Sequence, residues 1–161
     1  MLFFNRGMVN ELVEIVEFDP SFKKIYETYK KLVKSILPNI ELELIGSAAV
    51  PMKGKKEIDI MIVVEDIKDI QSKLTKLGFS KGPIEGKTAY MRDYRFGIEV
   101  EFHIVQKGSK KIVNARKLVN ILRNDGNLRK QFEELKEQYN GLNREEYRKR
   151  KSLFIQKILE S

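Results

Sequence analysis

The chain has 161 residues, no cysteine, one histidine (His103) and a formal net charge of +8. Disulfides, zinc–thiolate sites, iron–sulfur clusters, cysteine nucleophiles and multi-histidine metal centres are therefore excluded. The excess charge lies in the last third, because residues 107–161 hold fifteen Lys and Arg against seven Asp and Glu, whereas residues 1–106 hold sixteen of each. A basic protein of this kind could bind nucleotides, nucleic acid or an anionic membrane.

Membrane and export segments are not predicted. No stretch approaches the ~18 apolar residues of a membrane span. The apolar start, Met1–Phe4, is not followed by the hydrophobic region of a signal peptide. We therefore expect a cytoplasmic protein without membrane contact, folded as a single domain over residues 1–161.

The first part of the chain alternates helical and strand patterns. Asp19 and Pro20 are typical of a helix start, and Pro38 of a helix end. Gly78 is a natural left-handed helix stop. The periodicities predict a helix between Pro20 and Pro38, a strand over 40–45, a loop over 46–56, a central strand over 57–64, a short helix over 67–77, and strands over 87–94 and 97–105.

From Gly108 onward the periodicity is helical, over 109–124, 127–139 and 145–159. Asn143 followed by Glu146 resembles a capping box at the start of the last helix. The predicted fold class is α+β. Residues 17–106 form a mixed β-sheet head flanked by helices, and residues 107–161 form a basic three-helix segment packed on it.

The residues that indicate chemistry begin after the strand 40–45. Gly46 allows close backbone approach there, and Ser47 adds a hydroxyl group. Glu57 and Asp59 stand at positions i and i+2 of the next strand, so both carboxylates project from one face, roughly 7 Å apart at the backbone. Carboxylates in this arrangement can share two divalent ions about 4 Å apart. Mg²⁺ prefers such oxygen ligands, completed by substrate phosphates and water.

The strand 97–105 offers a third acid. Its apolar side chains alternate with Glu99, Glu101 and His103, which therefore share one face. Either glutamate could be the third metal ligand, and the same alternation is also typical of a strand with one face in solvent. His103 is a candidate ligand or general base, with a structural hydrogen bond as the alternative.

Three acids on two strands beside a Gly-Ser turn indicate a metal-dependent nucleotidyl-transfer site. The lysines of the loop 46–56 could neutralise phosphates, or could simply belong to a solvated loop. The predicted site comprises Glu57, Asp59 and Glu101 as catalytic residues, Glu57, Asp59, Glu99, Glu101 and His103 as metal ligands, and Gly46, Ser47, Lys55 and Lys56 as phosphate-binding residues.

The basic run Arg148–Lys151 falls on the last predicted helix. Four successive residues spread around a helix axis and cannot form one stripe. The run is therefore interpreted as a solvated face, with a contact surface for RNA or a nucleotide as the alternative.

Gly46-Ser47 with the Glu57-Ile58-Asp59-Ile60 strand resembles the nucleotidyltransferase superfamily pattern. The chain from about residue 16 to its end resembles more closely the GrpB family, a small group with a nucleotidyltransferase fold. GrpB-like segments also occur fused behind dephospho-CoA kinase. The resemblance is carried by Phe18–Phe22, by Ile45–Pro51 with Lys55–Ile60, and by a helical tail containing Leu122–Asn124, Phe132, Leu135, Lys136, Tyr147, Lys151, Phe154 and Ile155.

The resemblance implies a nucleotidyltransferase-like mixed sheet and leaves the activity of the GrpB family open. The expectation that the site uses Mg²⁺ and a nucleoside triphosphate comes from the three acids and the Gly-Ser turn. This chain departs from the family pattern at two places. Glu101 stands where the family has a histidine, and Glu57 is a variant that restores an acid pair with Asp59. If the pair is instead formed by Asp59 and position 61, Met61 leaves the site incomplete.

Three functions therefore stay open. The first is Mg²⁺-dependent transfer of a nucleoside monophosphate from a nucleoside triphosphate to an acceptor, whether RNA, a small molecule or a protein. The second is a non-catalytic nucleotide-binding or accessory module with a degenerate site. The third is a basic protein that associates with RNA through its helical tail.

Overall fold

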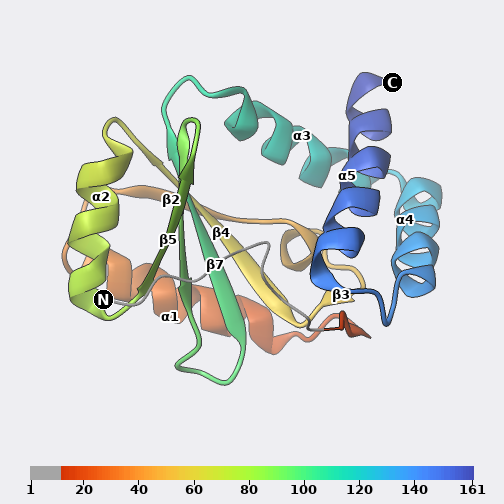
Figure 1. Ribbon diagram of the computed structural model, residues 1–161, viewed down its shortest axis with the longest axis horizontal. Coiled ribbons are helices and arrows are strands. Elements are labelled where there is room, and N and C mark those ends of the chain that lie inside the picture. Colours follow the sequence, from red (N-terminus) through yellow and green to blue (C-terminus); the bar gives the residue numbers. More distant parts are fainter. Residues whose placement is uncertain (1–11) are drawn as a thin grey trace.

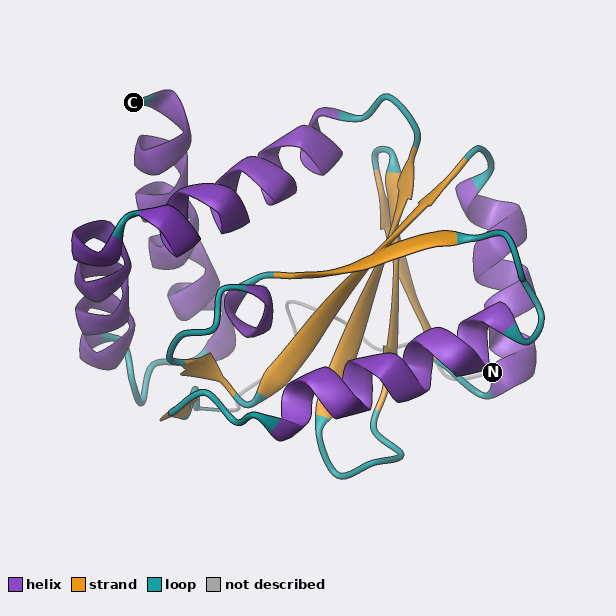
Figure 2. Ribbon diagram, turned by 180° about the vertical axis from the view of Figure 1, so that it is seen from behind, coloured by secondary structure: helices purple, strands orange, loops and turns teal. Residues whose placement is uncertain are grey.

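The structure is a computed structural model that describes residues 12–161, so the apolar stretch Met1–Phe4 lies outside the described residues. Figures 1 and 2 show a twisted sheet with helices around it. The elements are β1 (Ile15–Val16), α1 (Ser21–Lys34), β2 (Glu41–Ile45), the 3-10 turn η1 (Ser47–Ala49), β3 (Gly54–Lys55), β4 (Glu57–Val64), α2 (Ile67–Leu74), the 3-10 turn η2 (Thr75–Leu77), β5 (Ser80–Glu85), β6 (Thr88–Asp93), β7 (Glu99–Gln106), α3 (Lys110–Asn124), α4 (Gly126–Gln138) and α5 (Arg144–Glu160).

The main sheet has five strands in the order β2-β4-β7-β6-β5. β4 and β7 are parallel, and the other neighbouring strands are antiparallel. The predicted α+β class and the central position of the strand 57–64 are confirmed. β5 has no counterpart among the predicted strands, because Gly82 and Pro83 interrupt its pattern. Proline is tolerated in this strand because β5 lies at the sheet edge, where a missing N–H costs little.

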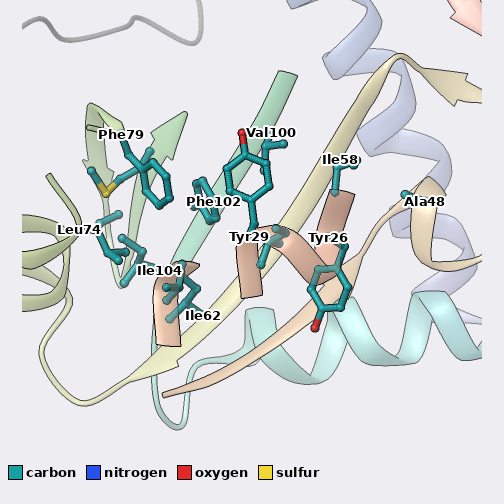
Figure 3. Close-up of a cluster of buried hydrophobic side chains, with 14 of the residues drawn as sticks. Tyr26, Tyr29, Ala48, Ile58, Ile62, Leu74, Phe79, Val100, Phe102 and Ile104 are labelled. Atoms are coloured by element: carbon teal, nitrogen blue, oxygen red, sulfur yellow. The ribbon is translucent and has the colours of Figure 1, made fainter. Parts of the chain in front are cut away.

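One face of the sheet packs against α1 and α2. Ile58, Ile60 and Ile62 of β4 are fully buried on this face. Phe102 of β7 stacks on Phe79 with 4.5 Å between ring centroids, and Tyr29 of α1 lies edge-on to Phe102 (Figure 3). Because side chains alternate along a strand, the residues between these apolar ones point to the opposite face.

The opposite face is partly covered by the C-terminal helices. α3, α4 and α5 lie together beside one end of the sheet, on the right in Figure 1. Ile112 of α3 packs with Met61 and Val105 of the sheet. A second apolar cluster joins all three helices to residues 49–52, the segment after β2. The three-helix tail therefore packs against the part of the head that contains the Gly-Ser turn.

The helix starts are capped as their sequences predict. Asp19 Oδ1 accepts a hydrogen bond from the Ser21 backbone N–H, and Asn143 Oδ1 accepts one from Glu146. The Asn143 cap fixes the first turn of α5, which contributes to the site described below. No helix within residues 12–161 has the length and apolar character needed to cross a membrane.

Candidate functional site

The turn after β2 brings the backbone against an acidic side chain. Gly46 has φ +71°, and a Cβ atom at this position would lie 3.0 Å from Asp59 Oδ2. A side chain here would be strained by the backbone conformation and crowded by the carboxylate. Gly54 is required for a steric reason alone, because its Cβ would lie 2.7 Å from Ser47 Oγ. The two glycines therefore pack the Gly46-Ser47 turn closely against β3 and β4.

Asp59, Glu101 and His103 form one cluster at the start of the parallel strands. Asp59 of β4 is the register partner of Glu101 of β7, and His103 follows two residues later on the same face. His103 Nε2 lies 3.1 Å from Asp59 Oδ1 and 3.3 Å from Glu101 Oε1. One ligand atom from each residue lies within 4.8 Å of the other two. The structure thus brings together three of the predicted metal ligands.

The charges around Asp59 keep its carboxylate ionised. Burial by itself would raise the pKa of Asp59. The hydrogen bond with His103, with the positive charges of Lys151 and Lys55 nearby, lowers that pKa below its ordinary value. An ionised carboxylate at neutral pH is the form that binds a cation.

Glu57 and Glu99 are register partners on the same face, but they do not join this cluster. A terminal nitrogen of Arg144 lies 2.8 Å from Glu57 Oε2 and 2.9 Å from Glu99 Oε2. Lys55 Nζ lies 3.1 Å from Glu57 Oε2, and Arg92 Nε lies 2.6 Å from Glu99 Oε1. Two predicted metal ligands are therefore engaged by basic side chains.

A cleft of about 180 Å³ opens beside the acidic residues. The sheet contributes Glu57, Asp59, Glu101 and His103 to its walls, and Gly46 and Lys55 lie at its edge. α3 supplies Ala115 and Leu118, and α5 supplies Tyr147, Arg148 and Lys151. The cleft thus has carboxylates on one wall and basic side chains on the other.

Ser47 lies in an adjoining hollow of about 50 Å³, which shares Gly46, Asp59 and Lys151 with the cleft. Ser47 Oγ accepts a 2.5 Å hydrogen bond from Lys136 Nζ of α4. Lys136 is almost completely buried, and its ammonium lies 4.4 Å from the Phe132 ring centroid. Burial, assisted by the charge of Lys151, lowers the pKa of Lys136 to about 7.

The predicted phosphate-binding residues are divided by the fold. Gly46, Ser47 and Lys55 line the cleft or the hollow. Lys56 is exposed and lines a separate depression next to Glu99 and Arg144.

The predicted site residues did not include Lys136, Arg144, Tyr147 or Lys151, which all lie in this region. Lys136, Tyr147 and Lys151 stand in the tail stretches that carry the resemblance to GrpB. Lys151 was grouped with its basic neighbours as a solvated run, yet it is half-buried and its Nζ lies 5.4 Å from the Tyr147 ring centroid. Burial lowers the pKa of Lys151, as does the charge of Lys55.

The cluster has the donor set of a divalent-cation site. Carboxylate oxygens suit Mg²⁺ and Mn²⁺, and an imidazole nitrogen suits the later first-row metals such as Zn²⁺. Gly46 leaves room beside Asp59 that a larger residue would fill. Asp59, Glu101 and His103 would hold the ion, and Lys151 and Lys55 would lie beside a phosphate bound to it.

Structures of Cid1, titled as a poly(U) polymerase and an RNA terminal uridylyl transferase, align with TM-scores of 0.51 and 0.55 at 20% and 18% identity. These alignments cover 71% and 76% of this chain and 41% of Cid1, so the chain spans about two fifths of that protein. The fold is nucleotidyltransferase-like.

Within that class, the chain belongs to the GrpB family, whose model, described as GrpB protein, matches residues 12–161. The crystal structure of GrpB from Enterococcus faecalis aligns with a TM-score of 0.70 and 22% identity, covering 90% of this chain and 99% of that one. A UPF0157 protein of Vibrio cholerae is 29% identical over 150 residues, which is 89% of this chain and 78% of the relative. A UPF0157 protein of Halalkalibacterium halodurans is 26% identical, covering 93% and 82%.

Proposed function

We propose that this GrpB-family protein binds a nucleoside triphosphate together with a divalent cation and transfers the nucleoside monophosphate to an acceptor hydroxyl group. The observation that carries the proposal is the convergence of Asp59, Glu101 and His103 in a cleft whose opposite wall presents Lys151. The titles of the Cid1 structures, which name MgGTP and UTP selectivity, add support by analogy of fold.

The roles of the side chains follow from their positions. Asp59, Glu101 and His103 would hold the cation, which supplies charge neutralisation and orientation for the triphosphate. Lys55 and Lys151 place positive charge over the phosphates, and Ser47 offers a hydroxyl group at the Gly46 turn. Lys136 fixes the orientation of that hydroxyl from α4.

The transfer balances without a further reactant. The acceptor oxygen forms a bond to the α-phosphorus, and the bond between that phosphorus and the oxygen bridging to the β-phosphate breaks. Pyrophosphate leaves, and the proton of the acceptor hydroxyl passes to solvent. The carboxylates and basic groups that line the cleft would stabilise the charge that develops during the transfer.

A second candidate is a nucleotide-binding module without transferase activity. The observation that favours it is the engagement of Glu57 and Glu99 by Arg144, because these two carboxylates are then not available to a metal ion. This candidate predicts binding of a nucleotide without release of pyrophosphate.

The third candidate, association with RNA through the basic tail, needs an accessible basic surface. Of the run Arg148–Lys151, Arg150 pairs with Glu146, and both Arg148 and Lys151 line the cleft. Lys149, Arg150 and Lys157 are exposed on this helix. Because Arg148 and Lys151 line the cleft, these two residues favour an anionic ligand inside the cleft over a long nucleic acid along the helix.

The deciding experiment titrates each of the four nucleoside triphosphates, with Mg²⁺ or Mn²⁺, into the wild type and Asp59→Asn by calorimetry. We expect binding by the wild type and a loss of at least about tenfold in the variant, as for removal of a charged ligand. Absence of binding by the wild type, or equal binding by Asp59→Asn, contradicts the proposal.

A second measurement separates transfer from binding. Pyrophosphate release is followed with an RNA oligonucleotide, with the protein itself and with small hydroxyl compounds as acceptors. Release that requires Asp59 supports the transferase, and binding without release supports the module. A gel-shift assay in rising salt, which weakens phosphate contacts steeply, shows whether RNA binds independently of the nucleotide.

A further inference from the structure

The cleft-facing carboxylates come in two successive cross-strand pairs. Glu57 of β4 lies opposite Glu99 of β7, and Asp59 lies opposite Glu101. Because residues i and i+2 of a strand share a face, the two pairs lie one after the other, roughly 7 Å apart along the strands. We call them the first pair, Glu57 with Glu99, and the second pair, Asp59 with Glu101.

In each pair, one nitrogen atom contacts both carboxylates. In the second pair, His103 Nε2 lies 3.1 Å from Asp59 and 3.3 Å from Glu101. In the first pair, the Arg144 nitrogen lies 2.8 Å from Glu57 and 2.9 Å from Glu99. A single guanidinium nitrogen thus bridges two strands, as a bridging cation would.

The guanidinium is enclosed and fixed in place. The side chains of Arg144, Glu57 and Glu99 are 7%, 8% and 14% exposed. Arg144 is the first residue of α5 and follows the Asn143 cap. Lys55 and Arg92 add two further positive charges to the same two carboxylates. Expelling Arg144 for a metal ion would leave a buried guanidinium without these partners, which is costly.

We propose that Arg144 takes the place of a second divalent cation, so that the cleft binds a single cation, held by the second pair and His103. The proposal rests on the proposed function only in assigning the metal to Asp59, Glu101 and His103. It differs from a two-ion site, in which carboxylates on neighbouring strand positions share two cations about 4 Å apart. The protein would then supply one of the two positive charges from its own chain.

The first test counts bound ions. Mn²⁺, which accepts oxygen ligands as Mg²⁺ does, is titrated into the wild type, Glu57→Gln and Asp59→Asn, and the unbound ion is measured by electron paramagnetic resonance. We expect one Mn²⁺ per chain in the wild type, and the same stoichiometry with affinity within about threefold in Glu57→Gln. Asp59→Asn is expected to lose at least about tenfold in affinity.

The outcomes separate the two claims. Two ions in the wild type, or a tenfold loss of affinity in Glu57→Gln, overturns the inference and leaves the proposed metal site standing. No ion bound to the wild type overturns the metal site of the proposed function itself.

The second test removes the guanidinium. Arg144→Met removes the nitrogen that bridges Glu57 and Glu99, while Lys55 and Arg92 stay beside one carboxylate each. We expect the variant to bind a second Mn²⁺ per chain between the two carboxylates. Arg116→Met is a matched control, because Arg116 also bridges two strand glutamates, Glu41 and Glu43, but at the exposed surface. The control is expected to keep one ion. A folded Arg144→Met protein that still binds one ion overturns the role of Arg144, and if this variant does not fold, the Glu57→Gln comparison decides.

Discussion

Lys136 Nζ lies 2.5 Å from Ser47 Oγ and so joins α4 to the turn after β2 across 89 positions of the chain. Lys136 Nζ also donates to the Lys53 carbonyl oxygen at 2.9 Å. A neutral amine has two hydrogens, which match these two acceptors. Because burial lowers the pKa of Lys136 to about 7, the amine is partly neutral at physiological pH.

This buried amine predicts a pH-dependent stability. Below pH 7 both the folded and the unfolded states hold the proton of Lys136, and the cost of burying the charge is complete. Between pH 7 and the ordinary lysine pKa of 10.5, the unfolded state holds one more proton, so the free energy of unfolding rises with pH by up to about 1.4 kcal/mol per unit. Lys136→Met removes this contribution.

The measurement is urea unfolding of the wild type and Lys136→Met at pH 6.0, 7.5 and 9.0. The free energy of unfolding of the wild type, relative to that of the variant, is expected to rise by about 2 kcal/mol between pH 7.5 and pH 9.0. Below pH 6.0 this difference should change little. Lys149→Met, at an exposed position, serves as the control. Parallel pH profiles for the wild type and Lys136→Met would contradict the assignment.

The close approach of Gly46 to Asp59 predicts a specific effect on metal binding. Gly46→Ala places a methyl group 3.0 Å from Asp59 Oδ2. Gly86 also has positive φ, at +60°, but nothing lies within 4 Å of its missing Cβ. Both alanine variants are expected to lose about 1–2 kcal/mol of stability from the backbone strain. Gly46→Ala alone is expected to lose Mn²⁺ affinity, by about tenfold.

These two glycine variants are compared by urea unfolding and by Mn²⁺ titration. Equal Mn²⁺ affinity in both would show that the position of Asp59 does not depend on the Gly46 backbone.

Lys151 is predicted to contact the phosphates of a bound nucleotide. Lys151→Ala removes a positive charge from the wall of the cleft, and a charge-assisted hydrogen bond contributes about 1.5–3 kcal/mol. Triphosphate affinity should therefore fall about tenfold or more. Lys149→Ala changes an exposed lysine two residues earlier and should leave the affinity nearly unchanged. Calorimetry with the three proteins checks this, and equal affinities would place the phosphates elsewhere.

Metal binding should also stabilise the fold. A ligand present at 100 times its dissociation constant raises the free energy of unfolding by about 2.7 kcal/mol. We expect this increase when Mn²⁺ is added to the wild type, and its loss when a chelator is added. In urea unfolding, the stability of Asp59→Asn should change neither with Mn²⁺ nor with the chelator. If Mn²⁺ stabilises Asp59→Asn as much as the wild type, the ion binds at another site.

Local sequence patterns were sufficient for most of the fold. The period of two placed Glu57 and Asp59 on one face of their strand, and Glu99, Glu101 and His103 on one face of theirs, because a strand has this period whatever its neighbours are. The register of β4 and β7 in the structure brings the two sets to the same sheet face. β5 was missed because Gly82 and Pro83 hide its alternation. β1 and β3, with two residues each, are too short to show a period.

The chemistry of the site was less accessible from the sequence. Whether Glu57 is available to a metal depends on Arg144, 87 residues away, and no local pattern encodes that contact. Lys151 was assigned to a solvated run because helix periodicity says which residues share a face, but not which face meets the sheet. The alternative interpretation of the run, a contact surface for RNA or a nucleotide, and the resemblance of this stretch to GrpB were the signs that Lys151 has a separate role.

The position of α5 has a consequence for the order in which the protein is made. β4 and β7 are synthesised before Arg144, Tyr147 and Lys151, which complete the opposite wall of the cleft. Because a chain can fold as it leaves the ribosome, the sheet can form while its Glu57 and Glu99 carboxylates still lack the Arg144 guanidinium. An intermediate that ends before residue 144 would therefore carry two closely spaced acidic groups without this partner, and cations from the solution would stabilise it.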